Sequence, residues 1–93
     1  MQKKRVYLIN SVEEYGKLMS FCIDNDISVF RTYWNESAKG ERCYEIDWKR
    51  KRCFFSSFDY CQREECCQIF KPVFLLECGK YFLYRGGVYE KKN

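Results

Sequence analysis

Hydrophobic periodicity is strongest near the start of the chain, where it predicts an α-helix. Ser11 and Glu14 have the spacing of a capping box, in which two side chains satisfy free backbone N–H groups at the first turn. The turn-forming run Asp24-Asn25-Asp26 marks the end. We therefore predict a helix over about residues 11–25. Its apolar positions have the three- and four-residue spacing of one buried face: Val12, Tyr15, Leu18, Met19, Cys22 and Ile23.

Strand patterns lie on both sides of this helix. The segments 5–9 and 27–34 are short and rich in β-branched and aromatic residues, which favours strands. After the polar loop that follows, apolar and polar residues alternate. This alternation predicts a half-buried strand in which Tyr44, Ile46 and Trp48 face the core.

The segment that follows this strand is predicted to return as its hairpin partner. Residues 53–55 are apolar and β-prone, which places Lys49–Arg52 at the turn. Beyond them, serine caps and apolar residues at 57–65 are compatible with a short second helix. The middle of the chain therefore predicts a hairpin that leads into a small helix.

The last third of the chain contains further β-prone runs. The first two, 66–70 and 73–76, are divided by Pro72, and a third covers 81–84. The glycine pair in Arg85-Gly86-Gly87 predicts a tight hairpin turn. Taken together, the pattern predicts an α+β fold, in which a small, mostly antiparallel β-sheet packs against one main helix and a short second helix is present.

Length and composition narrow the class of protein. A chain of 93 residues supports one modest core, so we predict a single domain over residues 1–93. No apolar run is long enough for a signal peptide or for the roughly 20 residues that span a membrane. Seven cysteines without an export signal favour reduced thiols. We therefore expect a cytoplasmic protein without membrane contact.

Catalytic chemistry has little support in the sequence. The chain contains no histidine, which excludes Cys–His and Ser–His–Asp catalysis and removes the commonest metal ligand. Cys53 follows four cations that would lower the pKa of its thiol, but a buried, inert strand cysteine is the favoured interpretation. No two cysteines have the C-x-x-C spacing of zinc sites. We expect neither an enzyme nor a bound metal or cofactor.

Charge is concentrated in one place. The chain has 17 basic and 13 acidic residues, a net charge of +4, so removing four consecutive cations would leave it neutral. Beside aromatic residues, such a patch is suited to nucleic acid, with the cations on phosphates and the rings stacked on unpaired bases. The alternative is a solvated hairpin turn whose flanking aromatic residues face the core. The cations concerned are Lys49, Arg50, Lys51 and Arg52.

Aromatic residues also favour a protein partner. Eight Phe, eight Tyr and two Trp exceed what one helix and a small sheet can hide, and Tyr, Trp and Arg dominate interface hot spots. A tyrosine-rich monomer surface is the alternative. Strands at 73–76 and 81–84 could also pair through a sheet edge with another chain, or with a second copy as a homodimer. The residues added to the basic turn as candidate partner contacts are Tyr33, Trp34, Tyr84 and Arg85.

The order of these segments resembles that of a known type of protein. A short strand, then SVEEYGKLMSFCIDNDISV, CYEIDWKRKRCFFSSFDY and CQIFKPVFLLE, is similar in layout to small bacteriophage and mobile-element proteins of the anti-CRISPR or anti-defence inhibitor type. The likeness covers about residues 5–77, includes no diagnostic motif and assigns no functional residue. It implies a non-enzymatic binder that occupies a surface of a bacterial defence protein or ribonucleoprotein complex in the host cytosol.

Many inhibitors of this type are acidic mimics of DNA, whereas this chain is mildly basic. Contact with a protein surface or with guide or target nucleic acid therefore fits the charge better. The alternative function is a nucleic-acid-binding module that uses the turn Lys49–Arg52 and the nearby aromatic residues.

Overall fold

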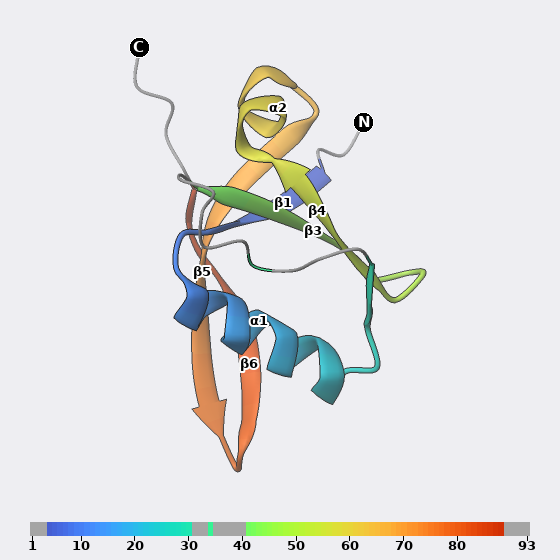
Figure 1. Ribbon diagram of the computed structural model, residues 1–93, viewed down its shortest axis with the longest axis vertical. Coiled ribbons are helices and arrows are strands. Elements are labelled where there is room, and N and C mark those ends of the chain that lie inside the picture. The colour runs from blue at the N-terminus through green and yellow to red at the C-terminus, as the bar shows by residue number, and fades with distance from the viewer. Residues whose placement is uncertain (1–3, 31–33, 35–40, 89–93) are drawn as a thin grey trace.

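The computed structural model describes residues 4–30, 34 and 41–88, which form one sheet and two helices (Figure 1). The fold is α+β, as the sequence predicted. The elements in chain order are β1 (Lys4–Ile9), α1 (Val12–Asp24), β2 (Ser28–Phe30), β3 (Arg42–Asp47), β4 (Arg52–Ser57), α2 (Phe58–Arg63), β5 (Cys67–Glu77) and β6 (Lys80–Val88).

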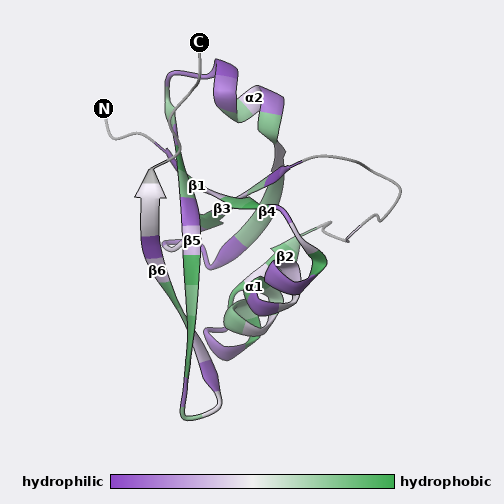
Figure 2. Ribbon diagram, turned by 90° about the vertical axis from the view of Figure 1, so that its left-hand side faces the viewer, coloured by the Kyte–Doolittle hydropathy of each residue, from purple (hydrophilic) through white to green (hydrophobic). Residues whose placement is uncertain are grey.

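Within the described residues, six strands form one mixed sheet in the order β2-β4-β3-β1-β5-β6. The pairs β1/β3, β3/β4 and β5/β6 are antiparallel, whereas β1/β5 and β2/β4 are parallel. The prediction of a mostly antiparallel sheet is therefore confirmed. Helix α1 packs on one face of the sheet, and α2 lies at the end of the molecule away from the tip of the β5–β6 hairpin (Figures 1 and 2).

Local signals determine where the helices begin. The Ser11 hydroxyl accepts a hydrogen bond from the Glu14 N–H at 3.2 Å, which caps the first turn of α1. The Ser57 hydroxyl accepts one from the Tyr60 N–H at 3.2 Å and caps α2 in the same way. Both helices lie within their predicted ranges and are confirmed.

The buried face of α1 is narrower than the sequence predicted. Leu18, Phe21 and Cys22 are buried, but Val12 and Ile23 are 51% and 74% exposed. At about 100° per residue, these two positions lie roughly 120° to 140° around the helix axis from Leu18. They therefore lie outside the buried face of α1, and the prediction that they belong to it is wrong.

Strand β1 fills two cores, one on each side of the sheet. Tyr7 and Ile9 pack into the larger core, which α1 covers. Val6 and Leu8 alternate with them and pack into the smaller core with Cys61 of α2. The two helices therefore cover opposite faces of the sheet.

The turn of the β5–β6 hairpin is not at the glycine pair, so that prediction is wrong. The chain reverses at Cys78 and Gly79, whose φ values of 50° and 78° suit a tight two-residue turn. Gly86 and Gly87 lie within β6, near an irregularity in its register with β5. A Cβ on Gly86 would collide with the backbone carbonyl of Lys71. The pair permits a close approach of two strands, which is another role of strand glycine.

Pro72 does not divide the chain into two strands, because β5 continues through it. Phe70 is the last β5 residue that pairs with β1, through Tyr7, so Pro72 lies just beyond that ladder. It also lies at the register irregularity with β6. Proline lacks an N–H and is tolerated at such positions.

The outer strands of the sheet are β2 and β6. Strand β2 contains only three residues of the predicted segment 27–34, and residues 31–33 lie outside the described ranges. On the other side, the Asp24 carboxylate at the end of α1 accepts a hydrogen bond from the Tyr81 N–H of β6 at 3.3 Å. The start of β6 is thereby tied to the helix.

Candidate functional site

The predicted β3–β4 hairpin is present, and its turn carries the basic run (Figure 1). Asp47 at the end of β3 pairs with Arg52 at the start of β4, so the loop contains residues 48–51. The Asp47 Oδ1 atom accepts a hydrogen bond from the Arg50 N–H at 3.1 Å. Lys51 follows in the left-handed conformation, with a φ of 55°. The turn begins one residue earlier than predicted, and Arg52 belongs to the strand.

Trp48 lies in this turn, so the prediction that it belongs to the core is wrong. Its side chain is 47% exposed because β3, and with it the alternation of faces, ends at the preceding residue. The ring packs edge-on against Phe21, with 5.8 Å between ring centroids. The Lys51 ammonium lies 5.8 Å from the centroid of the indole. Trp48 is thus an anchored but accessible aromatic surface beside cations.

The basic side chains of the run are exposed. Within the described ranges, no carboxylate forms an ion pair with any of them at 4.0 Å or less. Cations without an internal partner keep their attraction for an external anion. The charge of this segment is therefore available to a ligand. The residues concerned are Lys49, Arg50, Lys51 and Arg52.

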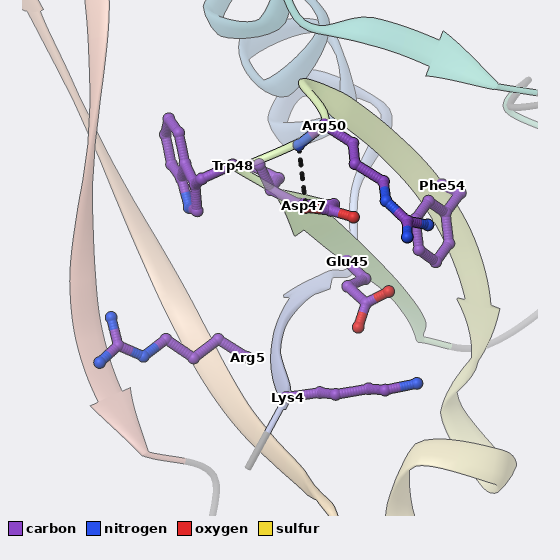
Figure 3. A pocket seen from close by; sticks show the side chains of 8 residues that line it. Lys4, Arg5, Glu45, Asp47, Trp48, Arg50 and Phe54 are labelled. Atoms are coloured by element: carbon purple, nitrogen blue, oxygen red, sulfur yellow. Dashed lines mark hydrogen bonds between the residues drawn. The ribbon is translucent and has the colours of Figure 1, made fainter. Parts of the chain in front are cut away.

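A hollow of about 390 Å³ lies next to the turn, at the end of the sheet where β1 begins and β3 ends (Figure 3). Arg5 and Trp48 point to one side of the strands, and the other labelled side chains gather on the opposite side. We call this second group the open sheet face. It consists of Lys4, Glu45, Asp47, Arg50 and Phe54.

Strand register explains why the open sheet face has this composition. Glu45 pairs directly with Phe54 of β4 on one side and with Val6 of β1 on the other. Phe30 of β2 pairs with Phe54 in turn and is 59% exposed. Residues that are directly paired point to the same face of a sheet. An aromatic ring and a carboxylate are therefore neighbours across the strands.

The same face is covered at its other end. Leu8 and Cys43 pack beneath α2, two positions along from Val6 and Glu45. Helix α2 contains only six residues, and none of them is among the residues that line the hollow. The open sheet face is the part of the sheet that α2 leaves accessible.

Sequence reasoning did not find Lys4, Glu45 or Asp47 as site residues. The alternation along β3 does place Glu45 and Asp47 on one face, opposite Tyr44 and Ile46. The pairing of β1 with β3, which brings Lys4 to the same place, leaves no local signal in the sequence. The carboxylates were detectable, but their basic neighbour was not.

Two of the predicted aromatic contacts have other surroundings. Trp34 is half-buried against the larger core, with the Arg42 guanidinium 3.7 Å from its ring centroid and Tyr15 at 5.6 Å. Its ring is therefore largely occupied by the protein itself. Tyr33 lies outside the described residues.

Tyr84 and Arg85 are exposed but lie far from the basic turn in the sheet. They belong to β6, and β5, β1 and β3 separate that strand from β4. Arg85 lies over Phe70, with 5.9 Å between its guanidinium carbon and the ring centroid. The structure therefore groups the basic run with the hollow and leaves Tyr84 and Arg85, which point to opposite faces of β6, away from it.

The face of the β5–β6 hairpin to which Tyr84 points is apolar. On β5 and β6, the pairs Val73/Tyr84 and Leu75/Phe82 point away from the face that packs against α1. Their side chains are between 41% and 50% exposed. We call this surface the apolar hairpin face; it consists of Val73, Leu75, Phe82 and Tyr84.

Cys53 has no exposed surface. A hydrogen bond with the Cys22 thiol, together with burial, raises the pKa of the Cys53 thiol. The neighbouring cations do not lower the pKa of this thiol, because their side chains are exposed to solvent. A thiol with a raised pKa forms little thiolate at neutral pH and is a poor nucleophile.

A second group of thiols lies beneath α2. Cys43 and Cys61 are buried together, and Cys67 packs against them. Burial raises the pKa of Cys43, and it raises the pKa of Cys67 to about 12. All seven cysteines are free thiols. In the part of the chain that the structure describes, no three Cys, Asp or Glu side chains are arranged to hold a metal ion.

Comparisons with known proteins do not assign this chain to a family. No protein family model, curated protein or solved structure matches the chain. Neither helix of the described segments is long and apolar enough to cross a membrane. The function is therefore inferred from the surfaces of the protein.

Proposed function

We propose that this protein is a non-enzymatic binding protein and that single-stranded nucleic acid is its ligand, held on the open sheet face and the β3–β4 turn. One observation carries the proposal: four exposed cations without described ion-pair partners lie beside accessible aromatic rings. Proteins that bind single strands combine cations that follow the phosphates with aromatic rings on which unpaired bases stack.

The surface fits a single strand better than a duplex. The rings of Phe54 and Trp48 can stack on bases only when those bases are unpaired and turned outward. No described helix carries the cations, as it would in a protein that reads the major groove. With four phosphates neutralised, we expect the logarithm of the binding constant to fall with the logarithm of salt concentration with a slope of about −3.

The chemistry of the described side chains supports binding without catalysis. The chain contains no histidine. Cys53, the thiol nearest to the basic run, is buried and has a raised pKa. The described residues therefore offer neither a histidine base nor a reactive thiol at the open sheet face.

The test is fluorescence anisotropy with a labelled single-stranded oligonucleotide. We expect binding by the natural protein and loss of most of the affinity when Lys49, Arg50, Lys51 and Arg52 are all replaced by Gln. The matched control replaces four exposed cations elsewhere by Gln and should retain binding: Arg63, Lys71, Lys80 and Arg85. Equal losses in both variants, or no binding by the natural protein, would contradict the proposal.

A second candidate function has its own supporting observation. An inhibitor of a bacterial defence complex, the type that the layout resembles, would need a surface for a protein partner. The apolar hairpin face supplies four half-exposed apolar or aromatic side chains on one side of a hairpin. Interfaces of this kind gain most of their free energy from a few such residues.

The two candidates separate in cells. In bacteria whose CRISPR system targets a plasmid, we expect an inhibitor to restore transformation by that plasmid. Replacing Leu75 and Phe82 by Ser should abolish the rescue, whereas the four Gln substitutions in the basic run should preserve it. Rescue that depends on the turn and not on the hairpin would instead support action through nucleic acid.

A further inference from the structure

The hollow contains acidic groups that simple phosphate binding does not explain. Lys4 and Arg50 suit a phosphate, but Glu45 and Asp47 point into the same space (Figure 3). A carboxylate repels a phosphate and weakens a site built only for anions. The ligand at this position must therefore offer hydrogen-bond donors as well as negative charge.

Glu45 is the group best placed to meet such donors. It is half-buried, directly paired with Phe54, and its carboxylate lies between the Lys4 side chain and the Phe54 ring (Figure 3). Within the described ranges no hydrogen bond or ion pair engages its carboxylate. Asp47 differs, because its Oδ1 atom already accepts the Arg50 N–H.

We propose that the hollow is a base-recognition subsite that selects guanine, with the Glu45 carboxylate accepting hydrogen bonds from the base while it stacks on Phe54. This inference rests on the proposed function, since it concerns one nucleotide of the bound strand. The subsite would give the protein a sequence preference, which the cations alone cannot give because phosphate contacts carry no sequence information.

The preference follows from the donors on each base. An ionised carboxylate only accepts hydrogen bonds, and its two oxygens can engage two parallel donors. Guanine presents two adjacent donors on its Watson–Crick edge, N1–H and the N2 amino group. Adenine and cytosine each place one amino donor next to a ring nitrogen that repels a carboxylate. Thymine and uracil place one N–H between two carbonyl oxygens.

The remaining side chains complete the site for a nucleotide. The Phe54 ring forms one wall, on which a base can lie flat. Lys4 and Arg50 are placed to donate hydrogen bonds to a phosphate or to the guanine O6 atom. The volume of about 390 Å³ falls within the range of small-ligand sites. The base and the phosphate thus each meet groups of suitable chemistry.

The test uses three oligonucleotides that differ only at the central base of a thymidine nonamer: guanine, hypoxanthine or thymine. Hypoxanthine is guanine without the N2 amino group, so the natural protein alone reports on the second hydrogen bond. By anisotropy, we expect the guanine oligomer to bind about tenfold more tightly than the thymine oligomer. Hypoxanthine should lose most of that preference.

Two variants locate the effect. Glu45→Gln should remove the guanine preference while affinity for the thymine oligomer stays equal or rises, because a negative charge is lost. Glu77→Gln removes an exposed carboxylate on the far hairpin and should leave all three affinities unchanged. Circular dichroism melting checks that Glu45→Gln is folded. If this variant does not fold, the comparison of guanine with hypoxanthine still tests the subsite, because it uses the natural protein.

The outcomes separate this inference from the proposed function. Binding to all three oligomers with equal affinity would overturn the guanine subsite and leave the single-strand function in place. A guanine preference that survives Glu45→Gln would also overturn it. No binding to any oligomer would remove both proposals.

Discussion

The open sheet face and the apolar hairpin face are both accessible, yet they differ in charge and in support. The open sheet face combines two carboxylates with neighbouring cations around a hollow, and the smaller core beneath α2 lies at its border. The apolar hairpin face carries four apolar or aromatic side chains on two strands that extend beyond both helices (Figure 1). Charge without internal partners favours a polyanion, whereas apolar area without charge favours a protein.

The largest effect should come from adding one methyl group where the two strands of the β5–β6 hairpin approach closely. Gly86→Ala places a Cβ against the Lys71 carbonyl and should lower the free energy of unfolding by about 3 kcal/mol, measured by urea denaturation. Gly87→Ala is the matched control, because its Cβ would meet no atom within 4 Å. If both substitutions lower the free energy of unfolding equally, the close approach of the strands at Gly86 does not limit which residue fits there.

The next effect concerns the electrostatic difference between the surfaces. Four phosphate contacts predict that raising the salt concentration from 50 to 200 mM weakens single-strand binding about 50-fold. Replacing the four cations of the basic run by Gln should flatten this dependence, whereas substitutions on the apolar hairpin face should not change it. A steep dependence that persists without the turn cations would place the phosphate contacts elsewhere.

Aromatic residues give a smaller, paired comparison. Phe54→Ala should weaken single-strand binding about tenfold by removing one stacking surface, as measured by anisotropy. Phe82→Ala removes a ring of the same size from the apolar hairpin face and should leave that affinity unchanged. A larger loss of affinity in Phe82→Ala than in Phe54→Ala would instead place the nucleic-acid contact on the hairpin.

The smallest effect concerns Tyr44 of the larger core, which stabilises the fold that carries both surfaces. Burial raises the pKa of Tyr44 to about 12 from the ordinary value of 10.0. Above pH 10 the unfolded chain loses this proton and the folded chain keeps it, so stability falls as pH rises. We expect the unfolding free energy of the natural protein to drop by about 1 kcal/mol more than that of Tyr44→Phe between pH 9 and pH 11. Parallel curves would show that Tyr44 ionises equally in both states.

Elements with local signals could be predicted from the sequence, and contacts between distant segments could not. Ser11 and Ser57 cap the helices that their spacing predicted. The pair Gly86-Gly87 misled, because two glycines suit a turn and also a close strand approach. Local sequence cannot tell these uses apart when Cys78 and Gly79 also permit a turn.

The candidate site divides in the same way. The basic run and its position at a hairpin turn follow from local sequence, and the structure confirms that hairpin. The approach of Lys4 to Glu45 depends on β1 pairing with β3, about forty residues later, which periodicity does not encode. Trp48 was misplaced because alternation alone does not show where a strand ends.

The hydrogen bond from the Tyr81 N–H to Asp24 has a consequence for how molecules meet at high concentration. An outer strand with free N–H groups is a template on which identical chains can add and grow into fibres. Here the helix carboxylate already occupies one such group at the start of β6, so an incoming strand must displace it before pairing there. Asp24→Ala should therefore shorten the lag time of fibril formation under mildly denaturing conditions.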